Sequence, residues 1–209
     1  MIIGITGGIG SGKSTIARAL AARGYAVYDC DKEAKRIIAE NKDVQQQIIN
    51  LFGEKSFVNG VYNTQYISKC VFSPSLQGRS GEALLAQLNA IVHPAVKEDI
   101  LSLPSTGRLG GAPFLFLESA ILYEAGLDSI CDKIIMVDAP EEVRIARTIA
   151  RDYHGDASPE NINKVRARIR AQEAVCHQLD QTCLSSQMVV HNDGKRSIEE
   201  LVTKITYWM

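Results

Sequence analysis

A glycine-rich turn near the start of the chain limits its fold more than any other feature. The run GGIGSGKS at residues 7–14 matches the pattern G-x-x-x-x-G-K-[ST]. It follows an apolar run at residues 1–6, without alternation, and precedes a helical segment at residues 14–23. In this setting backbone N–H groups converge on phosphate oxygens at the positive end of a helix. The motif predicts a phosphate-binding loop between a buried parallel strand and a helix.

The residue types in the loop indicate ATP and Mg²⁺ as its ligands. Lys13 is placed to reach the β and γ phosphates, and the Ser14 hydroxyl is a ligand for Mg²⁺. We expect the nucleotide to be held by Gly10, Ser11, Gly12, Lys13, Ser14 and Thr15.

The order of the predicted elements assigns the chain to the α/β class. The first strand, the helix and a second strand at residues 25–28 form a βαβ unit, which is right-handed almost without exception. Further buried strands are predicted at residues 114–117, 133–137 and 188–190. The sequence therefore predicts a P-loop fold with three layers, in which helices flank a mainly parallel sheet.

Two largely helical segments lie outside this pattern. Residues 32–103 are mostly helical, interrupted by VNGV at residues 58–61, which favours a small hairpin. Within them, the His93-Pro94 dipeptide is expected to end one helix and start another. Residues 160–177 form an arginine-rich helix after a polar loop. We expect a nucleotide-binding core made of residues 1–31, 104–147 and 177–209, a helical acceptor domain at 32–103, and a lid at 148–176.

Composition excludes several other classes of protein. Lys and Arg number 23 and Asp and Glu 24, so no general electrostatic attraction draws the chain to nucleic acid or an anionic membrane. The five cysteines lack zinc-ligand spacing, and no signal peptide or membrane span is evident, so we expect a cytoplasmic protein with reduced thiols. No Asn-Lys-x-Asp motif for guanine is present. A small-molecule kinase fits best.

Several segments spread along the chain carry a family resemblance. They are GITGGIGSGKS at 4–14, YDCD at 28–31, LNAIVHP at 88–94, ILYE at 121–124, Arg147 with Arg151 and Asp152, RIRAQ at 168–172, and NDG at 192–194. Taken together, these motifs resemble the dephospho-CoA kinase family over nearly the whole chain. The resemblance implies phosphorylation of the ribose 3′-hydroxyl of dephospho-CoA by ATP, the last step of coenzyme A synthesis. That family usually has proline where Ala120 stands and aspartate where Gln187 stands, and these two departures affect the expected local geometry more than the expected activity.

Residues on the acceptor side are predicted from their positions and from this resemblance. Asp29 and Asp31 follow the second strand, at the edge of the sheet where ligands bind in open α/β folds. Either could simply be a helix N-cap. The resemblance implies that Asp31 is the general base at the acceptor hydroxyl, and that His93 shapes the acceptor pocket. Thr6 at the end of the first strand is a further candidate to contact the substrate.

The metal and the transferred phosphate require additional groups. Glu118 ends the third apolar strand, where P-loop proteins keep a carboxylate for Mg²⁺, although an ordinary surface glutamate is the alternative. Arg144, Arg147 and Arg151 lie on one helix face, and Arg166, Arg168 and Arg170 follow across the polar loop. Arg147 and Arg151 are expected to contact ATP, Arg147 also during transfer, and Gln172 is a further candidate. Glu141 and Glu142 could instead pair with some of these arginines, which would then form only a solvated face.

Two other functions are compatible with the loop motif. One is a kinase acting on a different small molecule or nucleotide, and the other is a P-loop switch that binds nucleotide to regulate a partner. The expected partner is dephospho-CoA, without nucleic acid or membrane, and the expected state is a monomer or weak homo-oligomer.

Overall fold

The computed structural model describes residues 1–72, 80–179 and 187–209. These residues form two compact units, each treated separately below. The first unit comprises residues 1–29 and 109–209, and the second comprises residues 30–108.

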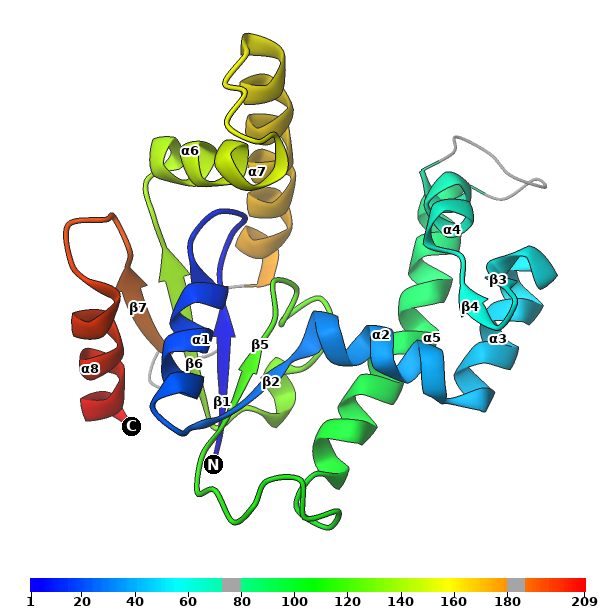
Figure 1. Ribbon diagram of the computed structural model, residues 1–209, viewed down its shortest axis with the longest axis horizontal. Coiled ribbons are helices and arrows are strands. Elements are labelled where there is room, and N and C mark those ends of the chain that lie inside the picture. The colour runs from blue at the N-terminus through cyan, green and yellow to red at the C-terminus, as the bar shows by residue number, and fades with distance from the viewer. Residues whose placement is uncertain (73–79, 180–186) are drawn as a thin grey trace. The chain divides into compact units, whose positions relative to one another are not determined.

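The first unit is built on a five-stranded parallel sheet, shown in Figure 1. The strand order is β2-β5-β1-β6-β7, so the strand that leads into the glycine-rich loop is central. The central strands are apolar along their length because both of their faces are covered. The predicted α/β fold is confirmed. The strands are β1 (Ile2–Thr6), β2 (Ala26–Asp29), β5 (Leu115–Glu118), β6 (Lys133–Asp138) and β7 (Gln187–His191).

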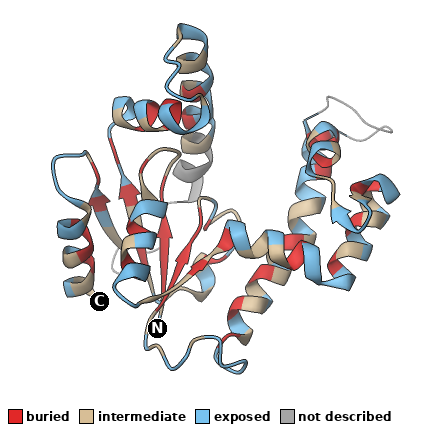
Figure 2. Ribbon diagram, in the orientation of Figure 1, coloured by how far each residue is buried: buried red, intermediate tan, exposed pale blue. Residues whose placement is uncertain are grey.

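Two helices, α1 (Lys13–Ala22) and α8 (Ile198–Trp208), pack together on one face of this sheet. Helix α8 begins with a capping box between Ser197 and Glu200, as its sequence pattern favours. A large apolar cluster lies between helices and sheet, and Figure 2 shows the strands as mostly buried. It includes Ile3, Ile5, Ile16, Leu20, Phe116, Ile135, Val137, Val190, Leu201, Val202 and Ile205.

A second helix pair, α6 (Glu141–Asp152) and α7 (Pro159–Leu179), lies beyond the carboxyl ends of the strands (Figure 1). The two helices have their own apolar cluster, formed by Ile145, Ile149, Val165 and Ile169. Ile9 of the glycine-rich loop packs against this cluster. The loop is therefore in contact with the sheet on one side and with the helix pair on the other.

The second unit is mainly helical. Its short hairpin turns at Asn59 and Gly60, which both have positive φ (51° and 76°), so the hairpin predicted from VNGV is confirmed. The elements are α2 (Cys30–Glu40), α3 (Lys42–Phe52), η1 (Glu54–Ser56), β3 (Phe57–Val58), β4 (Val61–Tyr62), α4 (Thr64–Val71) and α5 (Gly81–Ser102).

Pro94 lies inside the long helix α5. The expectation that the His93-Pro94 dipeptide divides two helices is therefore wrong. A proline in a helix removes one backbone hydrogen bond and strains the preceding turn. Buried residues on both sides of it, including Val92 and Val96, stabilise the continuous helix through packing.

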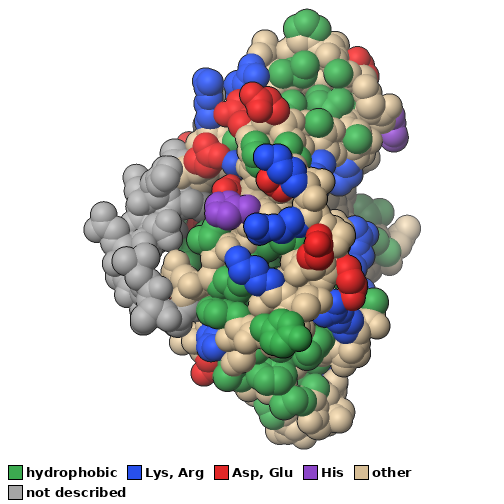
Figure 3. All heavy atoms as spheres, turned by 90° about the vertical axis from the view of Figure 1, so that its left-hand side faces the viewer, with side chains coloured by type: hydrophobic (Ala, Val, Ile, Leu, Met, Phe, Trp, Pro, Cys, Tyr) green, Lys and Arg blue, Asp and Glu red, His purple; other side chains and the backbone are tan. Residues whose placement is uncertain are grey.

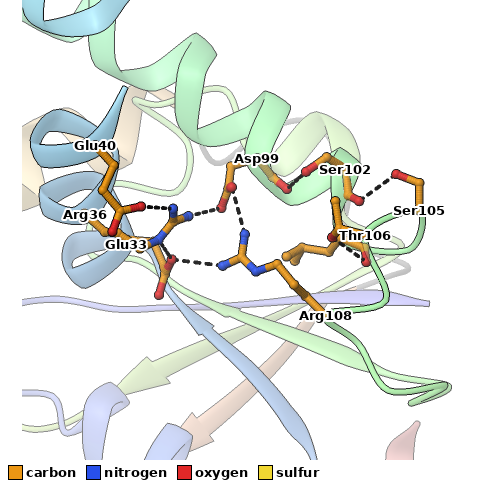
Figure 4. A network of polar contacts seen from close by, with 9 residues as sticks. Glu33, Arg36, Glu40, Asp99, Ser102, Ser105, Thr106 and Arg108 are labelled. Carbon is orange, nitrogen blue, oxygen red and sulfur yellow. Dashed lines mark hydrogen bonds and ion pairs between the residues drawn. The ribbon is translucent and has the colours of Figure 1, made fainter. Parts of the chain in front are cut away.

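Two arginines join α2, α5 and the segment after α5 in one ion-pair network (Figure 4). Arg36 contacts Glu33 (2.6 Å), Asp99 (2.8 Å) and Glu40 (3.0 Å). Arg108 contacts the same Glu33 (3.1 Å) and Asp99 (2.8 Å). The hydrogen bond that Arg36 donates to Glu33 makes the largest contribution to raising the pKa of Arg36. The network fixes the orientation of α2, the helix that carries Asp31 in its first turn.

On the face in Figure 3, acidic and basic side chains are interspersed. None of the helices in the described part of the chain combines the length and apolar character needed to cross a membrane.

Candidate active site

The glycine-rich loop depends on glycine at positions where a side chain has no room. Gly10 and Gly12 have φ of 76° and 95°, in the left-handed region. A Cβ atom at Gly10 would lie 2.3 Å from the carbonyl oxygen of Arg144, and one at Gly12 would lie 2.2 Å from Nδ2 of Asn192. Helix α1 begins directly after Gly12, at Lys13. Its first N–H groups are those that an α-helix leaves without an intrahelical partner, so this end of the helix suits a phosphate.

A hydroxyl and a carboxylate meet beside the loop. The Ser14 hydroxyl donates a hydrogen bond of 3.0 Å to Oε1 of Glu118. Glu118 is only 7% exposed, although it carries an ionisable side chain. A serine oxygen and one carboxylate, completed by phosphate oxygens and water, form the kind of site that Mg²⁺ occupies in phosphoryl-transfer enzymes. The two predicted metal ligands are therefore brought together.

The sheet register places three candidate residues from the sequence analysis, Thr6, Asp29 and Glu118, at one edge of the sheet. Glu118 on β5 is in register with Asp29 on β2, and with Ile5 on β1, which directly precedes Thr6. Thr6 is buried and Asp29 is half-buried. The carboxyl ends of β1, β2 and β5 thus present a hydroxyl and two carboxylates along the edge that carries the loop.

Arg147 contacts the loop through carbonyl oxygens. Its Nη1 donates to the carbonyl oxygens of Ser11 (3.2 Å) and Asn192 (3.0 Å), and its Nη2 donates to Oδ1 of Asn192 (3.2 Å). The buried Asn192 side chain also donates to the Ser11 carbonyl (2.8 Å). Arg147 and Asn192 therefore support the loop through its backbone carbonyl oxygens. The predicted contact of Arg147 with ATP remains a prediction.

Arg151 lies near the end of α6 and forms an ion pair with its neighbour Asp152. Its Nε is 2.6 Å from Asp152, which also contacts Arg168 at 2.9 Å. Arg151 contributes most to lowering the pKa of Asp152 to about 2. Arg166 pairs with Glu141 at 2.8 Å, as the alternative interpretation of the arginine face allowed. The role of Arg151 toward ATP stays a prediction.

Asp31 and His93 belong to the second unit. Asp31 is exposed in the first turn of α2, two residues after the end of β2. His93 is half-buried in α5, and burial lowers its pKa. A lowered pKa favours the neutral imidazole, which suits hydrogen bonding in a pocket better than ion pairing.

Sequence reasoning missed the role of Arg144, which is 6% exposed. Its Nε donates to the carbonyl oxygen of Ile9 (3.0 Å), and its Nη1 pairs with Glu173 (2.5 Å). Only the spacing of Arg144 and Arg147 on one helix face marked it out beforehand.

The two positions that depart from the family pattern both have defined contacts. The Ala120 carbonyl accepts a hydrogen bond from Nε2 of Gln172 (3.1 Å), and Nε2 of Gln187 donates to the Tyr123 hydroxyl (3.0 Å). Both contacts hold the segment that directly follows Glu118, the last residue of β5.

Comparison with known proteins identifies the family. The family model described as dephospho-CoA kinase matches residues 1–197. A dephospho-CoA kinase of Porphyromonas gingivalis is 37% identical over 184 residues, covering 88% of this chain and 85% of that protein. A crystal structure from Thermus thermophilus is 32% identical, with a TM-score of 0.72, and covers 100% of this chain and 96% of that one.

A dephospho-CoA kinase structure from Campylobacter jejuni shares the fold, with a TM-score of 0.64 and 20% identity, and covers 99% of this chain and 95% of that one. The match of the family model extends from the phosphate loop through β7 to the start of the last helix. This chain belongs to the dephospho-CoA kinase family.

Proposed function

We propose that the protein transfers the γ-phosphoryl group of ATP to the ribose 3′-hydroxyl of dephospho-CoA, giving coenzyme A and ADP. The observation that carries this proposal is the pairing of Ser14 with Glu118 at the mouth of a phosphate-binding loop, in a chain of this family. The loop and the pair supply what phosphoryl transfer requires from a protein, which is mainly positioning and charge stabilisation.

In this mechanism each side chain has a distinct task. The loop amides from Gly10 to Thr15 bind the phosphates, and Lys13 places its ammonium on the β and γ oxygens. Arg147 supports the loop and, with Arg151, would add positive charge as the leaving group develops. Asp31 accepts the proton of the attacking hydroxyl. Thr6 and His93 would orient the acceptor.

Ser14 and Glu118 would hold Mg²⁺. When bound, the ion would supply positive charge that offsets the charge developing on the transferred phosphoryl group. Among residues 1–72, 80–179 and 187–209, no cluster of three or more His, Cys, Asp or Glu side chains could form a protein-only metal cage. This agrees with a metal that is held largely through the nucleotide.

Replacing Glu118 by glutamine tests the metal site. The amide keeps the size of the side chain and an oxygen for the Ser14 hydroxyl, but it removes the charge. We expect the Mg²⁺ concentration at half-maximal rate to rise about 10- to 100-fold. Calorimetric titration with Mg²⁺ and a non-hydrolysable ATP analogue should show the same change. Glu142→Gln, at an exposed position of α6, is the control. Equal Mg²⁺ dependence of the Glu118 and Glu142 variants would show that Glu118 is not part of the metal site.

We propose that residues 32–103 bind the acceptor and that residues 148–176 form a lid. Residues 153–158 connect α6 and α7 and are mostly exposed. Amide exchange at 153–158 should slow when an ATP analogue and dephospho-CoA are both bound. Exchange measured by mass spectrometry in α8 serves as an internal reference. The same exchange rate at 153–158 with and without ligands would contradict the lid assignment.

The preferred acceptor distinguishes the proposed activity from that of another small-molecule kinase. With ATP and Mg²⁺, rapid turnover is expected for dephospho-CoA and not for nucleosides or nucleoside monophosphates. A P-loop switch would bind nucleotide tightly and show no acceptor-dependent ADP formation. We place the enzyme in the cytoplasm, as a monomer or weak homo-oligomer.

A further inference from the structure

One residue of the phosphate loop, Ile9, is held by the helix pair α6–α7 through its backbone. Its N–H donates to Oε1 of Gln172 on α7 (2.8 Å). Its carbonyl oxygen accepts from Nε of Arg144 on α6 (3.0 Å). Both hydrogen-bonding groups of this one residue are thus satisfied by side chains from outside the loop.

The Ile9 side chain points the same way as these contacts. It packs against the apolar cluster of Ile145, Ile149, Val165 and Ile169. Backbone and side chain together attach the loop to the helix pair at a single residue.

The Arg144 side chain, one of the two that contact the Ile9 backbone, is itself held in place. Nη1 of Arg144 pairs with Glu173, the neighbour of Gln172 on α7. The Arg144 guanidinium lies against Gly8, where a Cβ atom would come within 2.2 Å of Nη2. Among the described residues, no hydrogen-bond acceptor lies within reach of this buried Nη2 atom. The guanidinium is therefore held by packing and by two polar contacts, one to the loop and one to α7.

Gln172 also connects the loop to the metal side of the site. While its oxygen accepts from Ile9, its Nε2 donates to the Ala120 carbonyl (3.1 Å), two residues after Glu118. A side-chain amide makes both contacts possible, because its oxygen accepts a hydrogen bond and its NH₂ group donates one. One side chain therefore sets the separation between the loop and the segment that follows Glu118.

From these contacts we infer that Gln172 and Arg144 are positioning residues for phosphoryl transfer, acting through Ile9. The Ile9 peptide groups influence the direction of the neighbouring loop amides, because φ and ψ of each residue set the orientation of the two planar peptide groups on either side of it. Holding both sides of Ile9 keeps these amides aimed at the phosphates before ATP arrives. The inference rests on the proposed kinase function and adds how the loop amides are kept aligned with the phosphates.

Gln172→Met tests this role, because methionine is similar in size but neither accepts from Ile9 nor donates to Ala120. We expect kcat/KM for ATP to fall about 10- to 100-fold, as for a displaced reacting group. KM for dephospho-CoA and the melting temperature should stay close to the wild-type values. Asn163→Met, at an exposed position on the same helix, is the control and should leave all three parameters unchanged.

A double-mutant cycle that combines Gln172→Met with Ile9→Ala supplies a measurement that a purely structural role of Gln172 would leave unchanged. Ile9→Ala removes the packing on the α6–α7 cluster and should lower kcat/KM for ATP by a similar factor. Because both changes release the same residue, the double variant should lose little more than the worse single variant. Combining Ile9→Ala with Asn163→Met should give the Ile9→Ala value alone.

Two results would overturn the inference. One is a Gln172→Met protein with a lowered melting temperature and nearly normal kcat/KM for ATP, which would make Gln172 a stabilising contact only. The other is multiplication of the two losses in the double variant, which would make the effects of Ile9 and Gln172 independent. A failure of the kinase function itself is distinguishable, because the wild-type protein would then show no turnover.

Discussion

Lys13→Ala is expected to give a folded protein that has lost nearly all phosphoryl transfer. The lysine stands at the first position of α1, directly after the left-handed Gly12, where its ammonium can follow the transferred charge. Removing a group that stabilises charge mainly in the transition state costs on the order of 10² to 10³ in kcat or more. Steady-state rates with ATP and dephospho-CoA, beside a thermal melt, measure both parts of this expectation.

The control for this variant is Lys204→Ala, at an exposed position of α8 in the same unit. It removes the same charge away from the loop and should leave the rate unchanged. A Lys13→Ala protein with near-normal turnover would overturn the assignment of residues 7–14 as the phosphate loop.

Asp31→Asn is expected to separate a general base from a structural residue of a helix end. Helix α2 begins at Cys30, so Asp31 lies in its first turn and not at the N-cap position as the sequence allowed. Asparagine keeps the size of the side chain and removes its charge from the N-terminal end of the helix, so a purely structural Asp31 should lose at most about 1 kcal/mol of stability. A general base should lose on the order of 10² to 10⁴ in kcat. We predict a nearly unchanged melting temperature and ATP affinity, with severely reduced phosphorylation of dephospho-CoA.

Asp29→Asn is the matched control, two residues earlier in the chain. Asp29 ends β2 beside Glu118 in the sheet, so some effect on the site is expected, but a smaller loss of rate. If Asp31→Asn turned over at close to the wild-type rate, Asp31 would be structural, and the proton would leave to solvent or through another carboxylate such as Glu118.

Local rules were enough to predict the parallel sheet and the loop that it presents. Gly12, Lys13 and Ser14 follow a buried strand and open a helix, and that order alone fixes the loop at the end of a central strand. The position of Glu118 at the end of an apolar run likewise predicted its place at the edge of the sheet. These predictions succeed because parallel strands bring their carboxyl ends together whatever the details of packing.

Contacts that arise from tertiary packing could not be predicted from the sequence. Arg144 and Asn192 bind backbone carbonyls of the loop, and a carbonyl leaves no mark in the sequence that would reveal such a partner. The course of α5 through Pro94 was wrongly predicted for a related reason. Proline lowers local helix propensity, but burial on either side of it decides the outcome.

The most direct test of the proposed reaction is the product formed from dephospho-CoA and ATP labelled in the γ-phosphoryl group. With Mg²⁺ and the wild-type protein, mass spectrometry should show dephospho-CoA heavier by one labelled phosphoryl group, with fragmentation placing it on the adenosine ribose. Coenzyme A should co-elute with this product. Release of the label as free phosphate, with dephospho-CoA unchanged, would contradict the proposed function.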